Sequence, residues 1–174
     1  MLRIISHLLV EEDMEWISNL KLQKLLYYAQ AYSLVILKRP IFPEAIEHWT
    51  HGLVVPEIYH KYKDYGFSLL PVVSELDLQK YQDDELYILQ RVRTEKGCYT
   101  AWALRNETHY EAPWINTHSG EEITTDAIAE YFSQVLEKTD FNFDLQEIRQ
   151  SIESGFEIIP EFENEQDLMN WMMK

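Results

Sequence analysis

The residues best suited to metal or acid–base chemistry are histidines that gather in two stretches of the chain. The first stretch holds His48, His51 and His60, and Glu57 could add a carboxylate to them. Protein metal sites need three or four converging ligands with defined geometry. The spacing of these histidines matches no common zinc pattern. We therefore predict no metal and no other cofactor here.

The second stretch holds His109, Glu111 and His118. A histidine beside a carboxylate can act as an acid–base pair, so a small metal-dependent hydrolase is one alternative function. The structural interpretation is that His109 bonds to the backbone and fixes the turn at Trp114. Cys98 could be a nucleophile only beside a base and an oxyanion site, and a lone cysteine is more often a small buried residue. With no phosphate loop or nucleophile elbow in the chain, we predict no enzyme.

Two lysines could bind an anionic group. Lys21 and Lys24 are one helical turn apart and share a face with Tyr28, in a chain that is otherwise acidic. One interpretation is contact with a carboxylate on a partner or ligand. The other is an internal ion pair with Glu47 or Glu57, the apolar stems covering the core. The second is favoured because most lysines of this kind are structural.

The helix that carries these lysines is predicted over residues 18–37. Ser18 or Asn19 supplies an N-cap oxygen, and Arg39 followed by Pro40 marks the stop. Apolar or small residues recur at three- and four-residue spacings on one face: Leu22, Leu25, Leu26, Ala29, Ser33 and Ile36. The helix is also apolar outside this face, which is typical of a helix at the centre of its domain.

The remaining signals predict mostly helices. We expect helices over 56–65, 83–96 and 99–107, and a further helix capped by Thr124 or Thr125. A short strand is expected over 46–49, with a positive φ at Gly52 in the following turn, and an irregular segment over 108–120. The predicted fold is mainly α, or α+β with minor short strands, and forms a compact helical domain around the long helix.

Composition and charge limit the possible partners. The 174 residues are 46% apolar, which suits a buried core, and carry a net charge of −15. An acidic surface repels nucleic acids and anionic membranes and suits a basic partner protein, although solubility alone also explains the charge. With one cysteine, no apolar run of ~20 residues and no signal-peptide pattern, we predict a cytoplasmic protein without nucleic-acid or membrane contacts.

The last part of the chain differs from the rest in charge. Residues 139–174 hold nine acidic and two basic side chains, a net charge of −7. We predict an acidic C-terminal extension with a docked helix and a short terminal helix. The alternative is a segment that wraps a basic partner.

Three blocks of sequence carry a family resemblance. They are LKLQKLLYYAQAYSL, PIFPEAIEHWTHGLVVPEIYHKYKDYG, and ETHYEAPW followed by ITTDAIAEYF. Together, over roughly residues 1–138, they resemble the Panacea domain, the SocA-like or GepA-like group of phage-associated proteins. One departure is Gly52-Leu53-Val54-Val55, where the family usually has Gly-Pro-Val-Val.

The resemblance implies an antitoxin that neutralises a cognate protein toxin by direct binding. A second function that it implies is that of an adaptor, which hands the toxin to a cytosolic protease and for which residues 139–174 are the candidate contact. Trp and Tyr dominate energetic hot spots at protein interfaces. The candidate partner-binding residues are Lys21, Lys24, Tyr28, Trp49, His51, Tyr59, His109 and Trp114.

Overall fold

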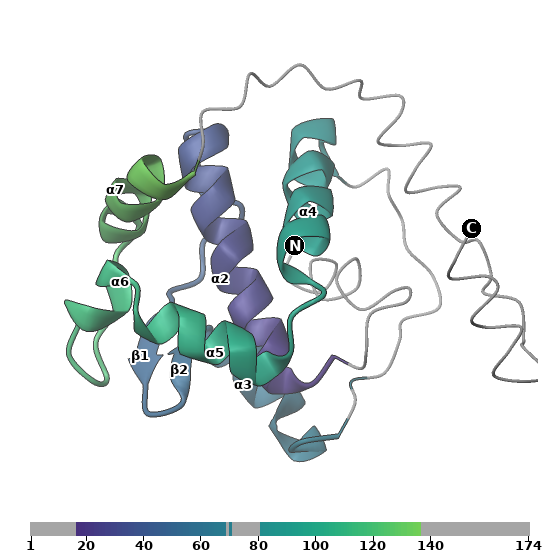
Figure 1. The fold of residues 1–174 in the computed structure, drawn as a ribbon. Helices are drawn as coiled ribbons and strands as arrows, with labels where there is room; N and C mark the ends of the chain where they lie inside the picture. The colour runs from purple at the N-terminus through teal and green to yellow at the C-terminus, as the bar shows by residue number, and fades with distance from the viewer. Residues whose placement is uncertain (1–16, 69, 71–80, 137–174) are drawn as a thin grey trace, which may run out of the picture.

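The computed structural model describes residues 17–68, 70 and 81–136, and the fold is given for these residues alone. They form a mainly helical domain with a two-stranded antiparallel sheet (Figure 1), as the sequence predicts. The elements are α2 (Asn19–Ile36), β1 (Glu47–Trp49), β2 (Gly52–Val54), α3 (Pro56–Tyr62), the 3₁₀ helix η1 (Lys63–Tyr65), α4 (Asp83–Lys96), α5 (Ala101–His109), α6 (Ala112–Ile115) and α7 (Thr125–Val135). In these ranges no helix has the length and apolar character needed to cross a membrane.

Helix α2 is the centre of the fold. Helices α4 and α7 flank it and α5 crosses it, while β2 and α3 also contact it (Figure 1). The hydroxyl of Ser18 accepts the backbone N–H of Lys21 at 3.3 Å, which is the predicted N-cap. The helix is buried on nearly all sides from Asn19 to Ser33. The prediction of a central helix is therefore confirmed, and it ends at Ile36, close to the predicted stop.

Aromatic packing seats α7 against α2. The ring of Phe132 lies 5.7 Å from that of Tyr27, 6.0 Å from Tyr28 and 6.4 Å from Tyr32, measured between centroids. The rings meet edge to face, the arrangement that aromatic pairs prefer. Phe132 and Ile128 are the buried residues of α7, so one face of this helix docks on the tyrosines of α2.

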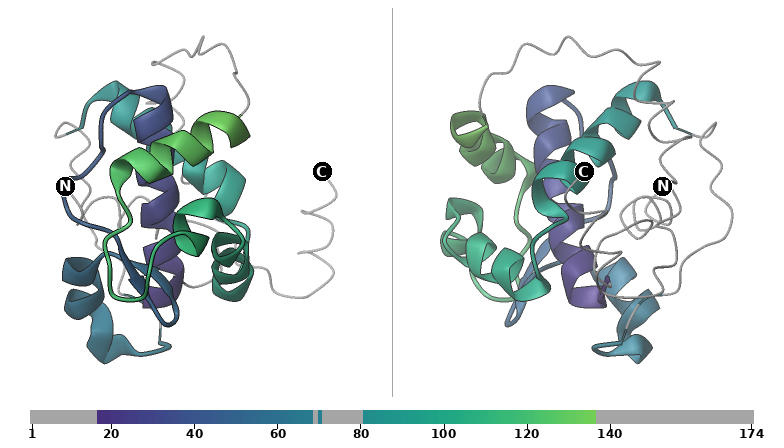
Figure 2. Two further views of the ribbon diagram at one scale, coloured as in Figure 1. Left: turned by 90° about the vertical axis from the view of Figure 1, so that its left-hand side faces the viewer. Right: turned by 45° about the vertical axis from the view of Figure 1, so that its right-hand side comes forward.

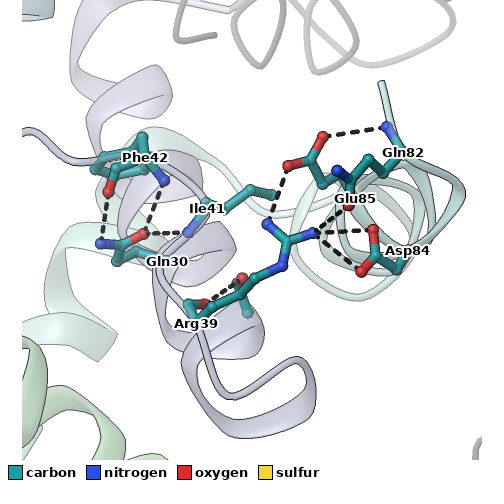
Figure 3. A network of polar contacts seen from close by, with 8 residues as sticks. Gln30, Arg39, Ile41, Phe42, Gln82, Asp84 and Glu85 are labelled. Atoms are coloured by element: carbon teal, nitrogen blue, oxygen red, sulfur yellow. Dashed lines mark hydrogen bonds and ion pairs between the residues drawn. The ribbon is translucent and has the colours of Figure 1, made fainter. Parts of the chain in front are cut away.

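A buried glutamine on α2 holds the loop that follows the helix (Figure 3). The Oε1 atom of Gln30 accepts the backbone N–H groups of Ile41 and Phe42 at 3.0 and 3.4 Å. Its Nε2 donates to the carbonyl of Phe42 at 3.1 Å. Buried backbone groups need partners, and here one side-chain amide supplies them where neither a helix nor a sheet does.

Arg39 joins the same loop to the start of α4 (Figure 3). Its guanidinium contacts Asp84 at 3.0 Å and Glu85 at 3.1 Å, with its side chain 35% exposed. Because solvent screens such a pair, we expect Arg39→Ala to lower the free energy of unfolding by only about 1 kcal/mol in urea denaturation. Arg39→Lys should recover less than half of this, since lysine lacks the planar fork. An unchanged urea midpoint in Arg39→Ala would contradict the expectation.

The hairpin and α3 lie at the N-terminal end of α2 (Figure 2). In the β1–β2 pair, Trp49 stands opposite Gly52, whose φ is +115° as the turn prediction requires. Helix α3 begins at Pro56, and η1 extends it to the positive φ of Gly66. The predicted strand, turn and helix over 46–66 are thus confirmed.

Two local predictions were wrong. The segment expected to be irregular contains α6, a helix too short to show periodicity, with Pro113 in its first turn. Cys98, expected to be buried, is exposed. Helix α5 also begins two residues later than expected, because Thr100 caps it by accepting from the N–H of Ala103 at 3.1 Å. The domain bounds at 138 and the helices of the 139–174 extension lie outside the described residues.

Candidate functional site

A groove of about 890 Å³ lies between the N-terminus of α2, the hairpin, α3 and α5. It draws residues from distant parts of the sequence, from Ser18 to Gly120. Large pockets of this kind are the default candidates for a binding site. The three views of the ribbon place the contributing elements at the same end of the molecule (Figures 1 and 2).

Four aromatic side chains line the groove. Trp49 and Tyr59 pack against each other edge to face, with ring centroids 5.0 Å apart. The indole N–H of Trp49 donates to Glu47 at 2.8 Å, which fixes the ring. Trp102 is 59% exposed and Phe67 is 93% exposed. Exposed large aromatics beside a hollow are typical of protein interaction sites.

The groove lining is basic although the protein is acidic. Lys63 and Arg105 line it together with His48 and His51, and among the residues that the structure describes no Asp or Glu lines it. In the whole chain, 30 of 174 residues are acidic. The Cζ atom of Arg105 lies 5.3 Å from the centroid of Trp102, so the guanidinium is stacked on an aromatic wall.

A buried lysine supports the hairpin next to this lining. Lys24 is fully buried, and its Nζ donates to the carbonyl of Leu53 at 2.8 Å. Burial, and then the nearby charge of Arg105, lowers the pKa of Lys24 to about 7. The expected ion pair with Glu47 or Glu57 is not formed by Lys24. The Leu53 carbonyl, rather than a carboxylate, accepts the hydrogen bond of Lys24 because β2 packs against this lysine.

His109 and Trp114 form a layer behind the hairpin. The Nδ1–H of His109 donates to the carbonyl of Arg105 at 2.6 Å. Trp114 stacks on His48 at 3.4 Å between ring centroids and contacts His109 at 4.1 Å. Burial lowers the pKa of His109. The bond to the Arg105 carbonyl opposes this effect, and the charges of Arg105 and Lys24 add to it. His109 thus makes the backbone bond that the structural interpretation predicted.

Glu111 faces the core rather than His109. Its Oε1 accepts the hydroxyl of Tyr28 at 3.0 Å. Burial raises the pKa of Glu111 above its ordinary value, against the opposing effect of this hydrogen bond. Because His109 and Glu111 bond to different partners, the structure does not assemble them as an acid–base pair.

The structure separates the predicted partner-binding residues into two groups. Trp49, His51 and Tyr59 meet at the groove. Lys24 and Tyr28 are fully buried and Lys21 is nearly so, which places all three in the scaffold; His109 and Trp114 lie behind the hairpin. The binding surface proposed below therefore excludes this second group.

Of the groove residues used here, sequence reasoning missed Lys63, Phe67, Trp102 and Arg105. Trp102 and Arg105 are three positions apart in a predicted helix, and this spacing puts them on one face. That pairing of an aromatic with a cation was an available signal. In the described ranges 17–68, 70 and 81–136, no group of three His, Cys, Asp or Glu side chains could hold a metal ion.

Comparison with known families identifies a match. The family model for the SocA-like antitoxin, Panacea domain, matches residues 22–115. These residues run from α2 to α6 and include all four aromatics of the groove. The match lies inside the range of roughly 1–138 over which the sequence resembles this family. Searches of the curated proteins and of the solved structures found no match.

Proposed function

The chain belongs to the family of SocA-like antitoxins with a Panacea domain, and we propose that it neutralises a cognate protein toxin by direct binding. In this role it occludes the toxin's functional surface and catalyses no reaction. The net charge of −15 favours a toxin with a basic surface, because complementary charge accelerates association.

We place the toxin-binding surface at the groove. The observation that supports this choice is the exposure of Trp102 and Phe67 beside the packed pair of Trp49 and Tyr59. Buried aromatic anchors surrounded by a polar rim carry most of the energy in protein interfaces. All four aromatics lie within residues 22–115, the part of the chain that defines the family.

The test is co-expression with the product of the neighbouring gene. We expect that product to arrest growth alone, and the wild-type chain to restore growth and to co-purify with it. Trp102→Ala and Phe67→Ala should each weaken binding by about tenfold or more, as loss of a hot-spot aromatic does. Isothermal titration of the purified pair measures this directly.

Tyr110→Ala is the matched control, because Tyr110 is 83% exposed yet lies outside the groove lining. It should bind the toxin like the wild type. If the neighbouring product is harmless alone, or stays toxic beside the wild-type chain, the antitoxin proposal fails. If Tyr110→Ala abolishes binding and Trp102→Ala does not, the surface lies elsewhere on α5 and α6.

A further inference from the structure

The two cations of the groove have no carboxylate partner in the part of the chain that the structure describes. Lys63 and Arg105 form no ion pair with any carboxylate of residues 17–68, 70 and 81–136. Two carboxylates that adjoin the lining bond elsewhere: Glu47 accepts from Trp49, and Glu121 contacts His118. In a protein with net charge −15, two cations without a carboxylate partner, in a hollow whose described lining contains no Asp or Glu, indicate a site for an anionic group.

The guanidinium of Arg105 is positioned to bind such an anionic group. Its Nε is buried and has no hydrogen-bond partner among the described residues, while Nη1 donates to the amide oxygen of Asn106 at 3.1 Å. A buried donor without a partner carries a desolvation penalty that a ligand can relieve. The guanidinium is stacked on Trp102, and this limits its motion and suits planar recognition of a carboxylate.

The layer behind the hairpin holds further basic side chains. The Nε2 of His109 and the Nδ1 of His48 are buried without partners in the described part of the chain. A Cβ at Gly52 would lie 2.3 Å from Lys24 Nζ and 3.3 Å from His109 Cε1, so these two groups meet at the turn. Burial lowers the pKa values of Lys24 and His109, and the positive charge of Arg105 lowers them further because these basic groups lie close together.

We propose that the groove binds a segment of the toxin that carries a carboxylate next to an apolar side chain. The carboxylate pairs with Arg105 and Lys63, and the apolar side chain lies among Trp49, Tyr59 and Trp102. The carboxylate belongs either to an Asp or Glu side chain or to the toxin's C-terminus. This inference rests on the proposed function, since the segment is taken to be part of the toxin.

A peptide fits these observations better than a nucleic acid does. The phosphates of a nucleic acid meet repulsion from an exterior of net charge −15 before they reach the groove. The aromatic lining also supplies apolar contact area around the cations. A toxin that is basic overall fits both the acidic exterior and the basic groove. Its net charge is attracted to the exterior, while one acidic residue enters the groove.

A phage-displayed library of random peptides tests the inference without the toxin. Selected against the full chain, the peptides should be enriched in Asp or Glu within two positions of an aromatic or aliphatic residue. The double variant Arg105→Gln/Lys63→Gln should bind a selected peptide at least about tenfold more weakly, as loss of a charge-assisted pair does. Lys38→Gln, at an exposed lysine outside the groove, should bind it unchanged.

Synthetic copies of a selected peptide distinguish the two sources of the carboxylate. If changing Glu to Gln weakens binding, the anchor is a side chain; if amidating the C-terminus does so, the anchor is the terminal carboxylate. Selection of peptides without acidic residues, or equal binding by the double variant, would overturn the inference. A thermal melt shows that each variant is folded, which we expect because Arg105 bonds to His109 through its backbone carbonyl.

Co-expression separates failure of the inference from failure of the proposed function. If the wild-type chain neutralises the toxin and Arg105→Glu does so equally well, the inference is wrong and the antitoxin function stands. If the wild-type chain does not neutralise the toxin, the proposed function fails whatever the peptide selection shows. We expect neutralisation by the wild type and by Lys38→Glu, and its loss in Arg105→Glu.

Discussion

Replacing Gly52 by alanine is expected to lower the free energy of unfolding by about 2–4 kcal/mol. Its φ of +115° is one that residues with a Cβ rarely adopt. The added Cβ would lie 2.3 Å from the Nζ of Lys24. A lysine end at the surface could move aside, but Lys24 is fully buried and holds the Leu53 carbonyl. Either the hairpin shifts or this hydrogen bond breaks.

Gly66→Ala is the control for backbone conformation alone. Gly66 also has a positive φ, +54°, but a Cβ there would meet no atom within 4 Å. We expect a loss of about 1–2 kcal/mol, because residues with a Cβ rarely adopt a φ of +54° with a ψ of −117°. Urea denaturation of both variants measures the two values. Equal losses would show that the contact with Lys24 contributes nothing and that conformation explains the whole effect.

The second expected result is a pH-dependent stability that originates from Lys24. Its pKa is about 7 in the folded protein and 10.5 in the reference state that represents the unfolded chain. The unfolded state therefore binds more protons between pH 7 and pH 10.5, so the free energy of unfolding rises with pH in this window. Below pH 7 the contribution of Lys24 is constant. The physical cause is the cost of a charged ammonium group in the core.

Comparison with Lys24→Met isolates this contribution. The variant also loses the hydrogen bond to Leu53, so the informative quantity is the change with pH of its stability difference from the wild type. Between pH 7 and about pH 9.5 this difference should change by about 2–3 kcal/mol, with the wild type gaining. Urea denaturation at several pH values measures it. A constant difference would mean that the charge of Lys24 does not change on folding.

Both results concern the support of the groove wall. Lys24 and Gly52 hold β2 at its place on α2. Strand β2 carries Val54 to the groove, and its partner strand β1 carries Trp49. A variant that weakens the contact between Lys24 and β2 should therefore weaken toxin binding, although the changed residue does not contact the toxin. Stability measurements on each groove variant distinguish such an indirect effect from loss of a direct contact.

Many helix and strand bounds could be predicted because their signals are local. Ser18 caps α2, Pro56 opens α3, Gly97 follows α4 and Thr124 caps α7, all as expected. A cap or a stop depends on hydrogen bonds within four residues along the chain, so the sequence itself contains the information. Helix α6 was missed because four residues show no periodicity.

The sequence by itself determined the family, the central helix and the excess of acidic charge, since each follows from residue types and their spacing. The tertiary structure alone decided which residues form the groove. The groove brings together Asn19, Tyr59 and Arg105, which no local pattern connects. The tertiary structure also decided that Lys24 bonds to the carbonyl of Leu53 rather than to a carboxylate. Burial and the partners of a polar group depend on packing between distant elements, and that packing forms only when the whole domain folds.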